Sequence, residues 1–134
     1  PKIRLVMRFF DQSMAQKLGK AFTVDSTFST SALAAPVFAA AALDEQVLGA
    51  YHMGDTVMAS VQIDVAAGTT LVGKSLRDAE ELLDAAVVGV RRLGQLPTHK
   101  FSRSESLRPG DALICHVAVE EITGVKTRAG VRAS

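Results

Sequence analysis

The spacing of apolar residues changes several times near the start of the chain. Residues 3–10 form an apolar run that predicts a strand, and the apolar positions of residues 14–22 recur at helical spacing. Asp11 or Ser13 can cap this helix, and residues 24–28 predict a second short strand. A strand, a helix and a strand in this order predict a βαβ unit, whose two strands are parallel and joined by a right-handed crossover.

Residues 31–43 then form an almost uninterrupted apolar segment. A helix that is apolar all the way round has no solvated face. In so small a chain this predicts packing between subunits or between lobes, or else a cover formed by a flexible loop. The two parallel strands before it also need cover on both faces of their sheet. We therefore expect further chain, or a partner, to complete this half.

A different pattern begins in the second half of the chain. Apolar and polar residues alternate over residues 57–65, which predicts a half-solvated strand of an antiparallel sheet. Ser75, with Asp78 three positions later, resembles a capping box and predicts the start of a helix. The inward positions of this helix would be Leu76, Ala79, Leu82 and Leu83.

Two more strands are predicted downstream, at residues 86–93 and 111–119. A type II turn leads into the second of them, because Pro109 and Gly110 can occupy its central positions. We divide the chain into a first lobe at residues 1–44, a boundary near 44–56, a second lobe at 57–122 and a flexible tail at 123–134.

Composition limits the possible functions. The chain has 134 residues, 48% of them hydrophobic, so it can bury a core. Its net charge of +1 gives no overall field that would attract nucleic acid. The single cysteine, Cys115, excludes an internal disulfide and suits a reducing compartment, and we expect it to be a small buried side chain. The uncharged stretch at 26–43 is interrupted by Pro36, which favours a buried helix over a membrane span.

No signal peptide is visible, and the first residue is Pro1. We therefore expect the chain to be a piece of a longer protein, a processed product or a trimmed chain.

Residues 68–75 match the pattern of a phosphate-binding loop letter for letter. However, the strand before them alternates instead of being apolar on both faces, and Leu71 and Val72 inside the loop favour burial. We interpret Gly68 as part of a turn and residues 73–75 as the entry to a helix.

Neither the histidines nor the acidic cluster predicts a metal site. His52, His99 and His116 never fall at the spacing of a helical ligand pair. Four acidic residues crowd one short helix, and a solvated helix face accounts for them better than binding of a divalent ion. They are Asp78, Glu80, Glu81 and Asp84.

A binding site for a small anion is predicted in the second lobe. The start of the helix at Ser75 would offer unpaired amide donors and a partial positive charge, next to Lys74. Arg91 and Arg92 belong to a possible basic surface, and on a regular strand at most one of them can line a given pocket. The members of that surface would be Arg91, Arg92, His99, Lys100, Arg103 and Arg108. We predict Lys74, Ser75, Arg91 and Arg92 as ligand-binding residues and no catalytic residue.

Two stretches together resemble the TrkA family, also called regulator of potassium conductance (RCK) domains. Residues 3–11 with 31–36 resemble the end of the TrkA N-terminal Rossmann lobe and its crossover helix. Residues 65–76 with 107–113 resemble the TrkA C-terminal lobe. The resemblance implies an α/β fold, in which the second half of a Rossmann-like lobe (βαβ plus crossover helix) is followed by a small α+β lobe.

The resemblance also implies a function. Members of the family are regulators without enzymatic activity, which assemble as homodimers or larger rings on the cytoplasmic face of a membrane potassium channel or uptake system. Their C-terminal lobe binds small ligands, and their Rossmann lobe binds NAD(H) or adenine nucleotides. We therefore expect that the full-length protein binds such a nucleotide.

This piece departs from the family in its cofactor lobe. Arg8 matches a family position that can approach the nucleotide phosphates and is the one cofactor-binding residue that we predict. The glycine-rich turn that would hold the pyrophosphate is absent, so we expect no cofactor in this piece. Thr30 and Ser31 stand where some members carry an acid that contacts a cation.

Two other functions stay open. A fragment of an NAD-dependent dehydrogenase would share the βαβ half but would not explain the second lobe. A free-standing sensor of a small molecule would need no transporter.

Overall fold

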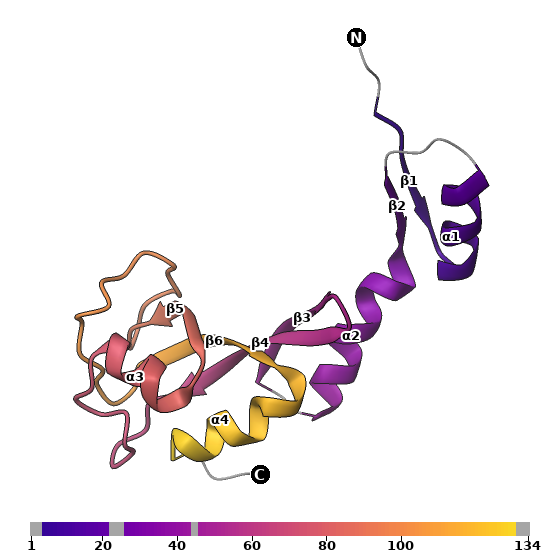
Figure 1. Ribbon diagram of the computed structural model, residues 1–134. Coiled ribbons are helices and arrows are strands. Elements are labelled where there is room, and N and C mark those ends of the chain that lie inside the picture. The colour runs from indigo at the N-terminus through magenta and orange to yellow at the C-terminus, as the bar shows by residue number, and fades with distance from the viewer. Residues whose placement is uncertain (1–3, 22–25, 44–45, 131–134) are drawn as a thin grey trace.

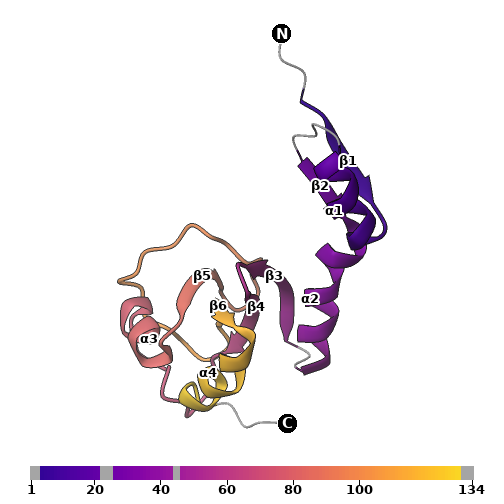
Figure 2. The same cartoon turned by 45° about the vertical axis from the view of Figure 1, so that its right-hand side comes forward.

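The computed structural model describes residues 4–21, 26–43 and 46–130 of the chain. Its elements form two units, and a helix, α2 (Thr30–Leu43), connects them (Figure 1). The view in Figure 2 shows α2 running alongside the second unit, while the first unit extends beyond its beginning. The fold is mixed α/β, as predicted.

The first unit is a βαβ arrangement. Strands β1 (Val6–Phe9) and β2 (Ser26–Ser29) pair in parallel, and α1 (Gln12–Ala21) connects them. Asp11 caps α1, because its Oδ1 accepts a hydrogen bond of 2.9 Å from the amide of Met14. The prediction of a parallel βαβ unit is confirmed, although the predicted beginning of the second strand, at residues 24–25, lies outside the described residues.

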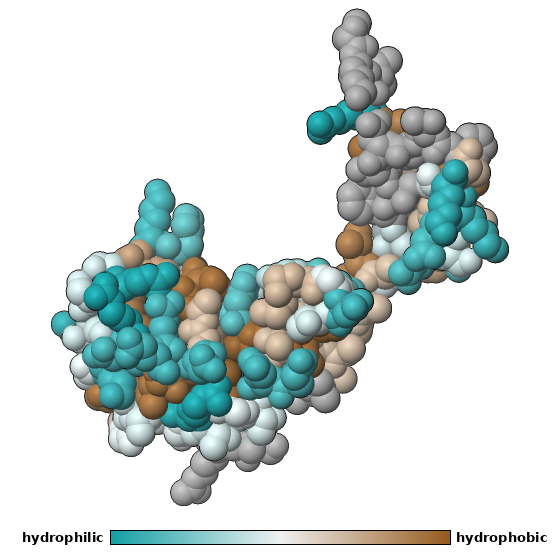
Figure 3. All heavy atoms as spheres, viewed as in Figure 1, coloured by the Kyte–Doolittle hydropathy of each residue, from teal (hydrophilic) through white to brown (hydrophobic). Residues whose placement is uncertain are grey.

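Helix α2 follows β2 directly and packs on the second unit through strand β3 (Val47–Met53). Ala40 is fully buried in this contact, but Leu33 and Phe38 are 60% and 76% exposed. Apolar residues therefore colour much of the surface between the two units (Figure 3). In the single chain α2 does have a solvated face, so the prediction of a helix without one is wrong. The burial of α2 against a partner stays a prediction.

The second unit is built on an antiparallel sheet with the order β3-β4-β6-β5. The strands after β3 are β4 (Thr56–Asp64), β5 (Ala86–Arg91) and β6 (Ala112–Ala118). The alternation predicted for β4 is confirmed, since Ala59, Val61 and Ile63 are fully buried and their neighbours are not. Gly110 has a φ of +90°, and the amide of Asp111 donates to the carbonyl of Arg108 at 3.1 Å, so the predicted turn is present.

Strand β3 was not predicted, because residues 44–56 were interpreted as a boundary. It forms a hairpin with β4, closed by the two residues Gly54 and Asp55. A glycine followed by an aspartate between two β-type runs is a hairpin signal, so the sequence did contain this information. His52, interpreted as a linker residue, lies in β3.

Helix α3 (Leu76–Leu83) begins where the capping pattern predicts. Ser75 is its N-cap, and the Ser75 hydroxyl oxygen accepts from the amide of Asp78 at 3.1 Å. Its inward residues Leu76, Ala79 and Leu83 are fully buried, and Leu82 packs beside them at the edge of the core.

The prediction of a flexible tail after residue 122 is wrong for its described part. A turn of 3₁₀-helix (Val119–Glu121) leads into α4 (Ile122–Arg128), in which Ile122 and Val125 are buried. The guanidinium of Arg128 donates to the carbonyl of Leu83 at 2.9 and 2.6 Å and so ties α4 to the end of α3. A helix this short depends on such tertiary contacts rather than on its own pattern. None of the described helices combines the length and the apolar character needed to cross a membrane.

Candidate functional site

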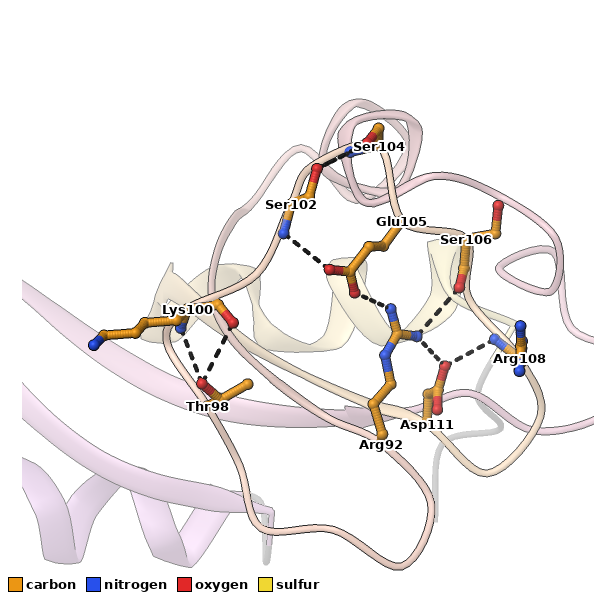
Figure 4. Close-up of polar contacts among 9 residues, drawn as sticks. All are labelled: Arg92, Thr98, Lys100, Ser102, Ser104, Glu105, Ser106, Arg108 and Asp111. Atoms are coloured by element: carbon orange, nitrogen blue, oxygen red, sulfur yellow. Dashed lines mark hydrogen bonds and ion pairs between the residues drawn. The ribbon is translucent and has the colours of Figure 1, made fainter.

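Arg92 lies at the centre of a polar cluster just after the end of β5 (Figure 4). Its Nη1 donates to Asp111 Oδ2 at 2.5 Å and to the carbonyl of Ser106 at 3.2 Å, and its Nη2 donates to Glu105 Oε2 at 2.6 Å. Only 4% of the Asp111 side chain is exposed. A planar guanidinium suits this role, because its fixed donors can hold several acceptors at once.

The cluster shifts the protonation of its members. The hydrogen bond from Arg92, together with one from the amide of Ser102, lowers the pKa of Glu105 from its ordinary value of 4.5. The same contact with Glu105 raises the pKa of Arg92, with a smaller contribution from Asp111. The ion pairs are therefore maintained at neutral pH.

The beginning of α3 is covered by residues 102–107, which we call the covering segment. The amide of Leu76 donates to the carbonyl of Glu105 at 3.0 Å, and the amide of Arg77 donates to the carbonyl of Arg103 at 3.0 Å. The Ser75 hydroxyl oxygen already accepts from the next amide. An anion at this helix start would need free donors, and these three amides are already bonded, so the binding role of Ser75 stays a prediction that these contacts do not favour.

The loop at residues 68–75 uses its amides internally as well. The amide of Gly73 donates to Leu107, the amide of Lys74 donates to Leu71, and the side chain of Leu71 is fully buried. Lys74 is also bound at its carbonyl, which accepts from the amide of Leu107 at 2.8 Å. These contacts agree with the interpretation of the loop as a helix entry and leave no ring of free amides for a phosphate.

Arg91 and Arg92 have different partners, as expected for neighbours near a strand end. Arg91 makes an exposed ion pair with Asp64 at 3.7 Å. Arg103, on the covering segment, pairs with Glu80 of α3. Half of the predicted basic surface is therefore neutralised by carboxylates, which disfavours a site for a simple anion there. The guanidinium of Arg108 has no partner among the described residues, and the hydrogen bonds of Arg108 with Asp111 come from its backbone.

Glu80 departs from the solvated helix face that was predicted for the acidic cluster. Besides its pairing with Arg103, it accepts a hydrogen bond of 3.0 Å from the amide of Val87. No three histidine, cysteine or acidic side chains of the described residues gather closely enough to hold a metal ion.

Cys115 is fully buried in β6, as predicted. Burial raises the pKa of its thiol to about 12. Because the thiolate is the reactive form, Cys115 stays a protonated side chain of the core.

A hollow of about 650 Å³ adjoins Arg92. Its lining residues are Arg92, Leu93, Gln95, Glu105, Ser106, Arg108, Pro109 and Asp111. A smaller hollow of about 300 Å³ lies between the first unit and β3.

Arg8 lies exposed on β1, in the other unit from Arg92, so the structure does not bring the predicted cofactor residue and the predicted ligand residues together.

Glu105 and Asp111 were missed as members of the site. For Asp111 a signal existed, because a carboxylate that opens an apolar strand becomes buried and then requires a partner. The identity of that partner had no signal, since Arg92 lies 19 positions away in the sequence.

No protein-family profile and no curated protein matches the chain. Three of the similar solved structures are described as "GsuK channel bound to NAD", "GsuK Channel" and "Crystal Structure of the GsuK RCK domain". Their sequence identities are 16%, 17% and 13%, and their TM-scores are 0.46, 0.46 and 0.45. They cover 97%, 97% and 98% of this chain, which spans 23%, 23% and 28% of theirs. TM-scores below 0.5 are too low for these likenesses to carry an argument about this chain.

Replacing Arg92 should destabilise the fold much more than replacing Arg91. Arg92→Ala leaves the buried Asp111 carboxylate without its charged partner, which should lower the free energy of unfolding by about 2 to 4 kcal/mol. Arg91→Ala removes only an exposed ion pair and should cost less than about 1 kcal/mol. Urea unfolding of both variants measures the difference. Equal losses would show that the Arg92 cluster contributes no more than a surface pair.

The lowered pKa of Glu105 predicts a loss of stability in acid. Its ionised form stabilises the folded chain above its ordinary pKa of 4.5, and this contribution disappears as the pH falls through the lower value of the folded state. Urea unfolding in a pH series should show this loss in the wild type and a shallower one in Glu105→Gln. Glu81→Gln, which changes an exposed carboxylate without a side-chain partner among the described residues, is the control. If the free energy of unfolding of Glu105→Gln fell in acid as steeply as that of the wild type, the stabilising role of the ion pair would be contradicted.

Proposed function

We propose that this chain is a cytoplasmic regulatory module without enzymatic activity, which senses a small ligand and controls a membrane potassium channel or uptake system. The observation that supports this most is the chain order of the structure: a parallel βαβ unit, the helix α2 and a separate small α+β unit. The stretches that resemble the TrkA family fall on this order. Residues 31–36 lie in α2, residues 65–76 lead into α3, and residues 107–113 lead into β6.

The chemistry of the described residues supports a regulator more than an enzyme. The most buried carboxylate, Asp111, is engaged by Arg92, and Cys115 is protonated. Neither group is prepared to act as a base or a nucleophile. A fragment of an NAD-dependent dehydrogenase would also leave the second unit unexplained. We propose that a nucleotide, if the full-length protein binds one, reaches this chain at Arg8.

The proposal can be tested through potassium flux. Deleting the coding region of this chain should change rubidium flux in the host cells, and re-expression of the full-length protein should restore it. Unchanged flux in the deletion strain under both low and high external potassium would contradict the proposed function. Reduction of NAD by the purified protein in the presence of a 2-hydroxy acid would favour the dehydrogenase instead.

We further propose that the protein is a homodimer or a larger ring, and that α2 contributes to the contact. Leu33, Val37 and Phe38 are exposed on α2 in the single chain. Burying about 400 Å² of such apolar surface would contribute roughly 10 kcal/mol before the cost of association is subtracted.

Phe38→Glu should therefore weaken self-association without destabilising the subunit, since Phe38 is 76% exposed. Sedimentation equilibrium should show a dimer or larger species for the wild type and a shift toward the monomer for Phe38→Glu. Thr123→Glu adds the same charge on the exposed side of α4 and should leave the assembly unchanged. A wild-type chain that is monomeric at micromolar concentration would contradict the proposed contact.

A further inference from the structure

We propose that the hollow beside Arg92 binds a small dipolar ligand, which carries a cationic nitrogen at one end and a carboxylate or phosphate at the other. Asp111 and Glu105 would receive the cationic end, and Arg108 and Gln95 the anionic end. This site replaces the simple anion site predicted from the sequence. The site names a ligand class for the proposed sensing function. Its biological purpose rests on that proposed function, whereas its binding chemistry does not.

The acidic end depends on one oxygen of Asp111. Oδ2 accepts both from Arg92 Nη1 and from the amide of Arg108, at 2.5 and 2.9 Å, whereas Oδ1 has no partner among the described residues. No side-chain nitrogen or oxygen of those residues that is closed off from solvent lacks a partner. Oδ1 is therefore not closed off from solvent, although Asp111 as a whole is only 4% exposed, and Asp111 is among the residues that line the hollow. Such an oxygen favours a donor, above all a charged one.

The balance of charge favours a cation at this end. A single guanidinium, that of Arg92, serves the carboxylates of both Asp111 and Glu105, so one negative charge is left in excess on this side of the hollow. A ligand nitrogen near Asp111 Oδ1 would offset it. An anion placed at this end would meet both Asp111 and Glu105 and would be repelled.

The opposite charge preference holds near Arg108 and Gln95. The guanidinium of Arg108 and the side-chain amide of Gln95 line the hollow, and neither has a partner among the described residues. A guanidinium binds carboxylate and phosphate through paired hydrogen bonds. Residues 108–111 place Arg108 and Asp111 on one turn, so the two ends of the site belong to one rigid element.

The lining of the hollow also includes apolar side chains. Leu93 and Pro109 both line the hollow. Leu93 lies over the turn so closely that a methyl group added at Gly110 would lie 3.0 Å from Leu93 Cδ1. A ligand whose charged ends are separated by methylene groups suits a hollow whose lining combines acidic, apolar and basic side chains. The volume of about 650 Å³ falls within the range of small-molecule sites.

The test compares three probes of equal chain length by amide NMR titration of the 134-residue chain. They are 6-aminohexanoate, which is dipolar, and hexanoate and hexylammonium, which each carry one of its charges. The dipolar probe should shift the amides of residues 92–95, 105–108, 110 and 111 and should bind at least about tenfold more tightly than either single-charge probe.

Variants at each end locate the contacts. Arg108→Gln should weaken binding of the dipolar probe about tenfold or more and leave the fold intact, since its side chain has no partner among the described residues. Asp111→Asn can keep its side-chain oxygen as an acceptor for Arg92 while its side-chain amide faces the ligand as a donor. This variant should also bind the dipolar probe about tenfold more weakly or worse. Should Asp111→Asn unfold, Glu105→Gln tests the same end. Lys100→Gln, an exposed change outside the hollow, is the matched control.

The proposal is wrong if the single-charge probes bind as tightly as the dipolar one, if Arg108→Gln binds like the wild type, or if no amide around the hollow responds at millimolar concentration. The site and the proposed function can fail separately. Binding in the hollow without any change of potassium flux in Arg108→Gln cells would refute the function alone. A flux response to a ligand that leaves the hollow unperturbed would refute the site alone.

Discussion

The second unit depends on the rule that a buried carboxylate must be paired. Asp111 opens β6 at a position where the strand enters the core, so its charge would be very costly without Arg92. The same guanidinium holds Glu105 and the carbonyl of Ser106, and it thereby fixes the covering segment. That segment supplies the acceptors for the first amides of α3. The ion pair of Arg92 and Asp111 is therefore connected by hydrogen bonds to the covering segment, and through it to the beginning of α3.

Local features of the sequence predicted the elements well, whereas contacts between distant residues were not accessible. The alternation of β4, the Ser75 cap and the turn at Gly110 each depend on residues close together in the chain, and each is present. Strand β3 carried a recognisable hairpin signal at Gly54 and Asp55, but α4 has too few apolar positions to be recognised without its contacts to α3. The predicted anion site at the start of α3 illustrates the limit most clearly. A capping pattern shows where amide donors begin, but not which distant carbonyls satisfy them.

The two units differ in how much they can bury. Nearly all the buried core residues belong to the second unit, while Ala15 and Ser29 are the buried residues described in the βαβ part of the first. A two-stranded parallel sheet with one covering helix exposes apolar groups such as Phe10, which is 84% exposed. Among the described residues the first unit therefore leaves apolar surface uncovered, whereas the second has a core of its own.

The position of the hollow determines how a ligand there could act on α2. Arg92 follows β5, and α2 packs on β3, so the two lie at opposite edges of the sheet β3-β4-β6-β5. Each strand is hydrogen-bonded to its neighbour, and such a sheet moves as a rigid layer more readily than it deforms. The core residue that α2 contributes at its contact with β3 is Ala40, and β3 adds the partly buried Val47 and Ala50. If the proposed ligand acts on the first unit, we expect its effect to pass through this hydrogen-bonded sheet and through the contact of α2 with β3.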